Sequence, residues 1–393
     1  MEHAGPPVVM GVISLVCLFV AIRSLRRRRL HLDVPTSKAK GVFLGLNEIK
    51  GTSRARAPLR SRMAAQPCVW YEWSVEERWE RKVTKTDAEG KTTTETESGW
   101  KTVARGGESV AFDLEDSTGR IRVVPEGAHI DGVRSLDETC GRSDPLYFEH
   151  APRTAISNST HRRHLRETIL PIDVDLYVIG TARMRADIVQ PEIAQAEYAE
   201  LFLISTKSEE QIVSGHYWAI LAAMVLGAGL AAGIGWMLAQ VEGALLGGGS
   251  FLGAMALAWT VLVYNGLASV RQRVEMSESM LDVQLRRRHI LIPRLQSCVT
   301  AIAGHERSVQ ESVVAMRAKG DLIALVEAYP ELKSDAHFQK LQGELIDTED
   351  RIALAREFVN NSVTTYNIRV ETLPAAIVAK LTGHRRRPLL KDS

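Results

Sequence analysis

Histidines are the residues of this sequence most suited to catalysis or metal binding, but their spacing matches no known site. His161 and His164 are three residues apart in a His-Arg-Arg-His run, where the two arginines would oppose a bound cation. The pair His305-Glu306 resembles part of a zinc protease motif, yet that motif needs a second histidine four residues on, and Val309 stands there. We therefore expect a solvated basic stretch at the first place and a polar helix edge at the second.

The four cysteines, Cys17, Cys68, Cys140 and Cys298, are isolated from one another. No pair has the short spacing of a structural zinc site, and one cysteine lies in an apolar segment, which argues against a disulfide framework. We expect reduced, mostly buried thiols. The serine, histidine and aspartate residues form no recognisable nucleophile motif either.

Four glycines, Gly227, Gly229, Gly233 and Gly235, superficially resemble a nucleotide-binding loop. Such a loop needs a preceding strand, whereas these glycines lie inside an uncharged apolar stretch. Gly229 and Gly233 would share one helix face, where small residues allow close helix packing. The sequence therefore predicts no catalytic residue, no cofactor-binding residue and no metal ligand.

Three apolar segments dominate the organisation of the chain. Residues 4–22, 213–240 and 247–268 lack charged side chains for about the 20 residues that a helix needs to cross a bilayer. We expect three transmembrane helices. The first is no cleavable signal peptide by its pattern, because its arginines follow the apolar run rather than precede it.

The positions of the arginines predict the orientation of these segments. Arg23 and the run Arg26–Arg29 follow the first segment, and Arg271 and Arg273 follow the third. By the positive-inside rule, the N-terminus and a 241–250 loop should lie outside, and the soluble regions 30–210 and 271–393 in the cytoplasm.

Residues 30–210 have the pattern of a β-rich domain. Val69, Tyr71, Trp73 and Val75 alternate with more polar residues, as in a half-buried strand. The Asp116–Gly119 turn signal separates two short apolar pairs and predicts a hairpin. The remaining expectations are an exposed hairpin tip at 82–98, a returning strand at 100–104, further strands near 176–181 and 201–206, and irregular structure over 131–168.

The C-terminal region has the apolar spacing of long helices. Two runs follow steps of three, four and seven: Leu281, Leu285, Ile292, Leu295, Val299, Ile302, Val309, Val313 and Met316; then Phe338, Leu341, Leu345, Ile352, Ala355, Val359, Tyr366 and Val370. Gly320 and Tyr329-Pro330 separate them, and Pro293 should kink or restart the first helix. Either the last part of the chain or a second copy should cover the remaining apolar surface. Asp347, Glu349 and Asp350 should form surface ion pairs with Arg351 and Arg356.

Residues 264–393 resemble the LemA family. The blocks that match are Tyr264-Asn265, Asp282–Leu285, Arg287–Pro293, His305-Glu306, Arg317-Ala318, Tyr329–Lys333, Phe338, Leu341-Gln342, Asp347–Ile352, Ala355-Arg356, Tyr366-Asn367 and Leu373-Pro374. The resemblance implies a bacterial membrane protein with an antiparallel helical bundle, and it implies no particular reaction.

Residues 30–210 resemble the GIDE-type, or beside-a-membrane, domain of mitochondrial membrane-anchored E3 ubiquitin ligases. The matching pieces are Pro67–Tyr71, Phe112–Asp116 with Gly119 and Val123–Pro125, and Leu176–Gly180. In those ligases a RING domain follows, and this sequence lacks the cysteines and histidines for one. The resemblance therefore implies a protein-binding domain at a membrane surface, without ligase activity.

Charge and composition narrow the function further. The net charge is +2 and the pI about 8.3, and the arginines cluster beside apolar segments, which favours a lipid bilayer over nucleic acid as partner. We expect an α+β multidomain membrane protein of the bacterial inner membrane that acts as a non-enzymatic scaffold or regulator, with envelope stress or protein quality control as hypothetical processes. The alternatives are a substrate-presenting subunit of a membrane protease or modifying enzyme, and a lipid-surface remodeller that uses Arg26–Arg29 and Arg286–Arg288. Self-association stays open.

Overall fold

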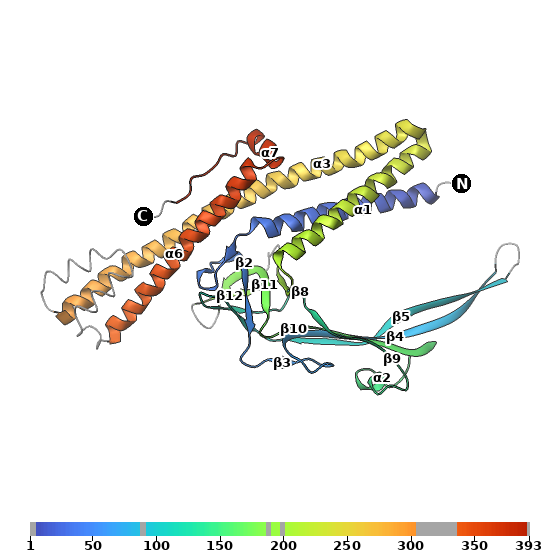
Figure 1. Ribbon diagram of the computed structural model, residues 1–393, viewed down its shortest axis with the longest axis horizontal. Helices are drawn as coiled ribbons and strands as arrows, with labels where there is room; N and C mark the ends of the chain where they lie inside the picture. The colour runs from blue at the N-terminus through green and yellow to red at the C-terminus, as the bar shows by residue number, and fades with distance from the viewer. Residues whose placement is uncertain (1–4, 87–91, 186–189, 197–200, 304–335, 391–393) are drawn as a thin grey trace. The chain divides into compact units, whose positions relative to one another are not determined.

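The computed structural model describes residues 5–86, 92–185, 190–196, 201–303 and 336–390. The protein has the predicted α+β architecture, with a β-rich region and long helices towards the C-terminus (Figure 1). It divides into two compact units. Unit 1 comprises residues 1–43 and 209–393, and unit 2 comprises residues 44–208.

Unit 2 contains a ring of five strands. These are β2 (Gly45–Arg54), β6 (Phe112–Glu115), β7 (Arg120–Val123), β12 (Pro191–Ala194) and β11 (Asp175–Met184). They pair in that order, and β11 also pairs with β2, which closes the ring. β13 (Leu203–Ser205) and β8 (His129–Asp131) continue from β11. Phe112 and Leu114 of β6 and Ile121 and Val123 of β7 are buried while their neighbours are not, because every second residue of a strand faces the same side.

The second sheet of unit 2 carries the longest strands. Its order is β3 (Leu59–Arg60), β4 (Pro67–Thr86), β10 (Ser159–Pro171) and β9 (Val133–Gly141), with β5 (Thr92–Ser109) paired to β4. The short helix α2 (Leu146–Glu149) precedes β10. Val75, Cys140, Tyr147 and Leu165 form a buried cluster beside this sheet.

Unit 1 is helical. It contains α1 (Gly5–Asp33), α3 (Glu209–Ala303), α6 (Ala336–Glu371) and α7 (Ala375–Leu381), and α1 is followed by β1 (Thr36–Ser37) and a 3₁₀ turn, η1 (Ala39–Gly41). The chain reverses inside α3, where Ala239 and Gln240 have non-helical dihedral angles. We refer to residues 209–238 as the first arm and residues 241–303 as the second arm (Figure 1).

The two arms of α3 are in close contact through glycines. A Cβ at Gly235 would lie 1.9 Å from the carbonyl oxygen of Gly243, and one at Gly247 would lie 2.2 Å from that of Ala231. Only residues without a side chain allow this backbone approach. α1 packs on both arms through a cluster that includes Cys17, Ala21, Leu25, Ala223 and Met255.

The second arm continues past its apolar segment and pairs with α6. Its Val270, Val274 and Leu281 pack against α6 side chains, namely Ile352, Ala355, Val359, Val363 and Tyr366. The predicted apolar stripe of α6 is confirmed from Phe338 to Tyr366, because each of its positions over that span is buried. α7 covers Val263 and Leu267, so part of the C-terminal region supplies the expected cover.

The sequence predicted three transmembrane helices, and the structure distributes the three apolar segments over two helical stretches. Among the described residues, two helical stretches are long and apolar enough to cross a membrane, Pro7–Asp33 and Glu209–Cys298. Segments 213–240 and 247–268 both belong to α3, as parts of its two arms. The predicted 241–250 loop is wrong, because the reversal needs only Ala239 and Gln240 and the following residues are helical.

Three local predictions need correction as well. Pro293 lies inside the second arm without non-helical dihedral angles around it, so it does not restart the helix. Residues 131–168, predicted to be irregular, contain β9, α2 and most of β10. The segment 82–98, predicted to be a hairpin tip, is largely strand: β4 extends to Thr86 and β5 begins at Thr92. The separators Gly320 and Tyr329-Pro330 lie outside the described residues.

Candidate functional site

The most prominent surface element of unit 2 is a two-stranded ribbon made by β4 and β5. The two strands pair from Trp70 opposite Ser109 to Thr86 opposite Thr92. β10 accompanies β4 only as far as Trp79, so beyond that point the ribbon consists of β4 and β5 alone. In the described part of the chain β5 pairs with β4 and no other strand, which leaves its outer backbone edge open. An open edge of this length can accept an added strand from another protein.

The sequence of the ribbon explains how two strands stay paired outside the sheet. The Trp79 ring lies over Gly99, and the Trp73 ring lies over Gly106, so closely that a Cβ would lie 3.1 Å from a ring atom at Gly99 and 2.9 Å at Gly106, shorter than van der Waals contact. Tryptophan opposite glycine thus buries an aromatic face without a clash. Further out, Arg81 and Glu97 form an exposed ion pair of 2.7 Å.

A buried ion pair fixes the base of the ribbon. Glu77 of β4 and Arg163 of β10 are both completely buried, with 3.1 Å between Glu77 Oε2 and Arg163 Nη2. Tyr147 and Ser159 donate hydrogen bonds to Glu77 Oε1, and Arg163 also donates to the Pro152 carbonyl. Burial opposes ionisation of Glu77, but the hydrogen bonds from Ser159, Tyr147 and Arg163 outweigh it, so the pKa of Glu77 lies below its usual value.

A second buried carboxylate ties β10 to the loop before β4. Glu167 accepts hydrogen bonds from the Ser61 and Ser135 hydroxyls and from the backbone N–H groups of Met63 and Ala64. Burial raises its pKa, yet these donors outweigh the burial and the net pKa is lowered. Sequence reasoning missed both carboxylates because their partners are far away along the chain.

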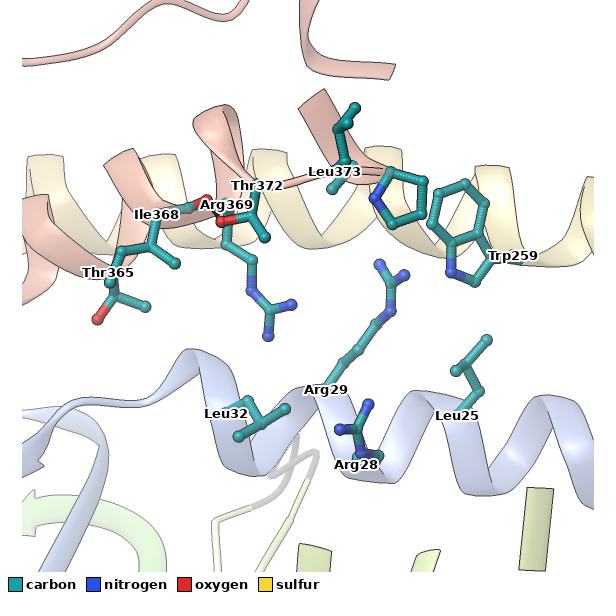
Figure 2. Close-up of a pocket in the computed structure, with 12 residues that line it drawn as sticks. Leu25, Arg28, Arg29, Leu32, Trp259, Thr365, Ile368, Arg369, Thr372 and Leu373 are labelled. Carbon is teal, nitrogen blue, oxygen red and sulfur yellow. Dashed lines mark hydrogen bonds between the residues drawn. The ribbon is translucent and has the colours of Figure 1, made fainter. Parts of the chain in front are cut away.

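Unit 1 contains a cavity of about 420 Å³ between α1, the second arm of α3 and the C-terminal part of α6. Arg28 and Arg29 approach it from α1, and Arg369 approaches it from α6 (Figure 2). Leu25, Trp259 and Leu373 contribute apolar walls. The cavity therefore combines concentrated positive charge with an apolar lining.

Specific contacts hold the arginines of this cavity. Arg369 Nη2 lies 2.8 Å from Asp33 Oδ1, and the Arg29 guanidinium lies 5.6 Å from the centre of the Trp259 ring. The Nε of Arg28 is buried without a hydrogen-bond partner among the described residues. A buried donor without a partner costs free energy, so a ligand that accepts its hydrogen bond would relieve that cost.

Two asparagines of α6 hold the C-terminal segment. The Asn367 side chain donates to the carbonyl of Arg387 and accepts from its N–H, at 2.8 and 2.9 Å. Asn360 makes the same two contacts with Leu390 at 3.3 and 2.8 Å. These paired contacts give the Tyr366-Asn367 block of the sequence a structural role, and the sequence alone offered no signal for Asn360.

The two histidines that the sequence singled out, His161 and His164, contact different residues. His164 bonds to Asp137 on β9, whereas His161 lies next to Tyr147 and Ser159. The prediction of a fully solvated basic stretch is wrong at Arg163, which is completely buried. Among the described residues, no group of three or more potential ligands could hold a metal ion. His305-Glu306 lies outside the described residues.

The four cysteines differ in how deeply they are buried. Cys17, Cys68 and Cys140 are buried and Cys298 is half-buried. Burial raises the pKa of Cys68 to about 11, which keeps this thiol protonated and unreactive at neutral pH.

The predicted packing role of Gly229 is wrong, because nothing lies within 4 Å of its Cβ position, whereas Gly233 faces Met10 of α1.

The predicted surface ion pairs of α6 form only in part. Arg351 pairs with Asp347 at 2.8 Å within the helix, as predicted. Glu349 instead pairs with Arg288 of the second arm at 2.7 Å, and Asp350 with Lys40 at 2.8 Å. Asp347 also lies 3.3 Å from Lys40, so all three acidic residues tie α6 to other elements of unit 1, which spacing along one helix could not reveal.

Comparison with known proteins identifies two regions. Residues 277–392 match the family model described as LemA family, and residues 80–235 match the GIDE model described as E3 ubiquitin ligase. Magnetosome protein MamQ of Magnetospirillum gryphiswaldense is 41% identical over 69 residues, which are 18% of this chain and 25% of that protein. Magnetosome protein MamQ 2 of Paramagnetospirillum magneticum is 39% identical over 75 residues, which are 19% of this chain and 28% of that protein.

The matches to the magnetosome proteins thus span about a quarter of each relative's own length. The two family matches lie within the regions where the sequence motifs predicted them, except that the GIDE match extends past residue 210 into the first arm of α3. This chain therefore carries a LemA-family region at residues 277–392 and a GIDE-type region at residues 80–235 on one polypeptide.

Proposed function

We propose that the chain is a membrane-anchored scaffold or regulatory protein that acts through protein–protein contacts at the cytoplasmic surface of a bacterial inner membrane. In this proposal α1 crosses the bilayer once and the two arms of α3 cross it as a hairpin. The N-terminus and the reversal at Ala239–Gln240 lie outside, and both units present their polar parts to the cytoplasm.

The observation that carries the proposal is the continuity of the second arm. Residues 241–303 form one helix that begins in an apolar stretch and ends in the LemA-family region, where it pairs with α6. A continuous helix holds that region at a fixed distance from the membrane. The outward faces of the apolar stretches support the placement, because side chains such as Leu15, Leu245 and Leu257 are more than two-thirds exposed.

The β4–β5 ribbon supports contact with a protein partner. Its open edge offers backbone donors and acceptors along β5, and Trp100 adds an exposed aromatic side chain, of the kind enriched at protein interfaces. We propose a membrane protein as the partner, because two anchored chains would be confined to the surface of the same bilayer. Envelope stress response and protein quality control are the processes we connect with such a scaffold.

In-cell photo-crosslinking tests this proposal. One strain carries a photo-reactive amino acid at Glu97 of the ribbon, and a second strain carries it at Thr364 on the exposed face of α6. Each is activated by light before detergent extraction and mass spectrometry. Reproducible membrane-protein adducts at Glu97 and none at Thr364 are expected. Adducts only with lipid at both positions, or a defined turnover by the purified chain, would contradict a scaffold role.

The GIDE match favours a second candidate function, a substrate-presenting subunit of a protease or protein-modifying enzyme. In that case the enzyme itself would supply the catalytic residues. The same crosslinking separates the two functions: an adduct with a membrane protease supports substrate presentation, whereas adducts with non-enzymatic proteins or with this chain itself support the scaffold.

A further inference from the structure

The cavity of unit 1 lies at the end of the apolar stretches, where the arginine run of α1 begins. Leu25 belongs to the apolar cluster that joins α1 to both arms, and Arg28 and Arg29 lie one helical turn further on. Trp259 of the second arm lies beside the same opening. Tryptophan and arginine at this position are typical of the boundary between hydrocarbon and headgroups.

The positive charge of the cavity favours the binding of an anion. Figure 2 shows the guanidinium groups of Arg28, Arg29 and Arg369 directed towards the space between α1 and α6. Asp33 neutralises Arg369, while Arg29 contacts an aromatic face and Arg28 keeps a buried Nε without a partner among the described residues. Arginine forks bind phosphate oxygens by two parallel hydrogen bonds, so phosphate chemistry matches these donors.

The rim of the cavity is apolar and favours contact with hydrocarbon chains. Ile368 and Leu373 line it and are 56% and 72% exposed, and Ile377 and Leu381 extend the exposed apolar surface along α7. A free anion would leave these side chains in contact with water. A molecule with an anionic head and acyl chains would cover them while its phosphate reaches the arginines.

We propose that this cavity binds the phosphate headgroup of an anionic phospholipid, with its acyl chains along Ile368, Leu373 and α7. The volume of about 420 Å³ is in the range of small-molecule sites. The inference rests on the membrane placement of the proposed function but not on the scaffold role. The arginine run therefore has two parts: exposed Arg26 and Arg27 serve orientation, and inward Arg28 and Arg29 serve lipid binding.

Native mass spectrometry of the full-length protein in detergent tests the proposal. Phosphatidylglycerol and phosphatidylcholine are titrated separately, and bound lipid is counted. Arg28→Gln and Arg29→Gln should each weaken phosphatidylglycerol binding roughly tenfold, the typical effect of losing a charge-assisted hydrogen bond. Arg27→Gln removes the same charge from the next residue outside the cavity and should change binding less than about twofold. Equal loss in all three variants would overturn the proposal.

A second pair of variants covers the case in which the arginine changes impair folding. Ile368→Asp adds a negative charge at the exposed rim, and Thr364→Asp adds it one turn away on the same helix, outside the cavity lining. Weaker phosphatidylglycerol binding in Ile368→Asp alone supports the site. Equal binding of both lipids by the unaltered protein overturns it, as does displacement of phosphatidylglycerol by an equal concentration of glycerol 3-phosphate, which would show a site for free phosphate. Because binding is measured in detergent, its failure is distinct from a failure of the crosslinking experiment.

Discussion

The buried pair Glu77–Arg163 provides the sharpest prediction about the GIDE-type region. Arg163→Met keeps the length and apolar character of the side chain but removes the charge that faces Glu77. Both side chains are fully buried, so the Glu77 carboxylate would remain in the interior without its cationic partner. Removing one partner of such a pair typically costs about 3–5 kcal/mol. The Arg163 contacts to the Tyr147 and Pro152 carbonyls are lost in addition.

Hydrogen exchange of the full-length protein, followed by mass spectrometry, measures this loss of stability separately for the peptides that contain β4 and β10. At about 1.4 kcal/mol per factor of ten, exchange of the protected β10 amides should accelerate roughly one hundred- to five-thousandfold. Arg162→Met is the matched control, because Arg162 is the exposed neighbour on the same strand and should change exchange little. The double variant Glu77→Leu with Arg163→Met should lose less protection than Arg163→Met alone. Unchanged β10 exchange in Arg163→Met would refute the reasoning.

Three further predictions concern the arms, the C-terminal segment and pH. Gly243→Val should lower the thermal unfolding temperature in detergent, because a Cβ there would lie 2.0 Å from the Gly235 carbonyl oxygen, whereas Gly253→Val has open space and should not; equal melting would contradict the close packing. Asn367→Ala should speed tryptic cleavage after Arg385 and Arg386, while Asn361→Ala on the exposed face should not, and equal rates would argue against the asparagine contacts. Because the pKa of Glu77 is lowered from its usual 4.5, its contribution to stability should be complete above about pH 4.5 and be lost as pH falls through the lower folded-state pKa; β10 exchange that ignores pH between 3 and 6, after correction for intrinsic rates, would contradict this.

The sequence predicted features that local patterns determine. The period of the apolar residues from Phe338 to Tyr366 defined the buried face of α6, and the Asp116–Gly119 turn defined the β6–β7 hairpin. In both cases the residues that decide the structure are near one another in the chain. The two family resemblances also depended on contiguous motifs, and the family comparisons confirm them.

The sequence could not reveal features that depend on distant partners. In the sequence, Arg163 belongs to the basic run His161–His164. Only its pairing with Glu77, 86 residues away, shows that it is buried. Gly235 and Gly243 become a packing pair only once the reversal at residues 239–240 is known. The cavity between Arg28, Trp259 and Arg369 likewise joins three elements, so no spacing along the chain could predict it.

Membrane crossing is the claim on which the proposed function depends most, and cysteine labelling in intact bacteria measures it directly. With Cys298 replaced by serine, the three remaining cysteines are buried. A cysteine at Glu242, next to the reversal, should react with a membrane-impermeant maleimide from outside the cell. A cysteine at Ser279, on the exposed second arm beyond the apolar stretch, should react only after the membrane is permeabilised. Labelling of both positions in intact cells, or of neither before permeabilisation, would contradict the account.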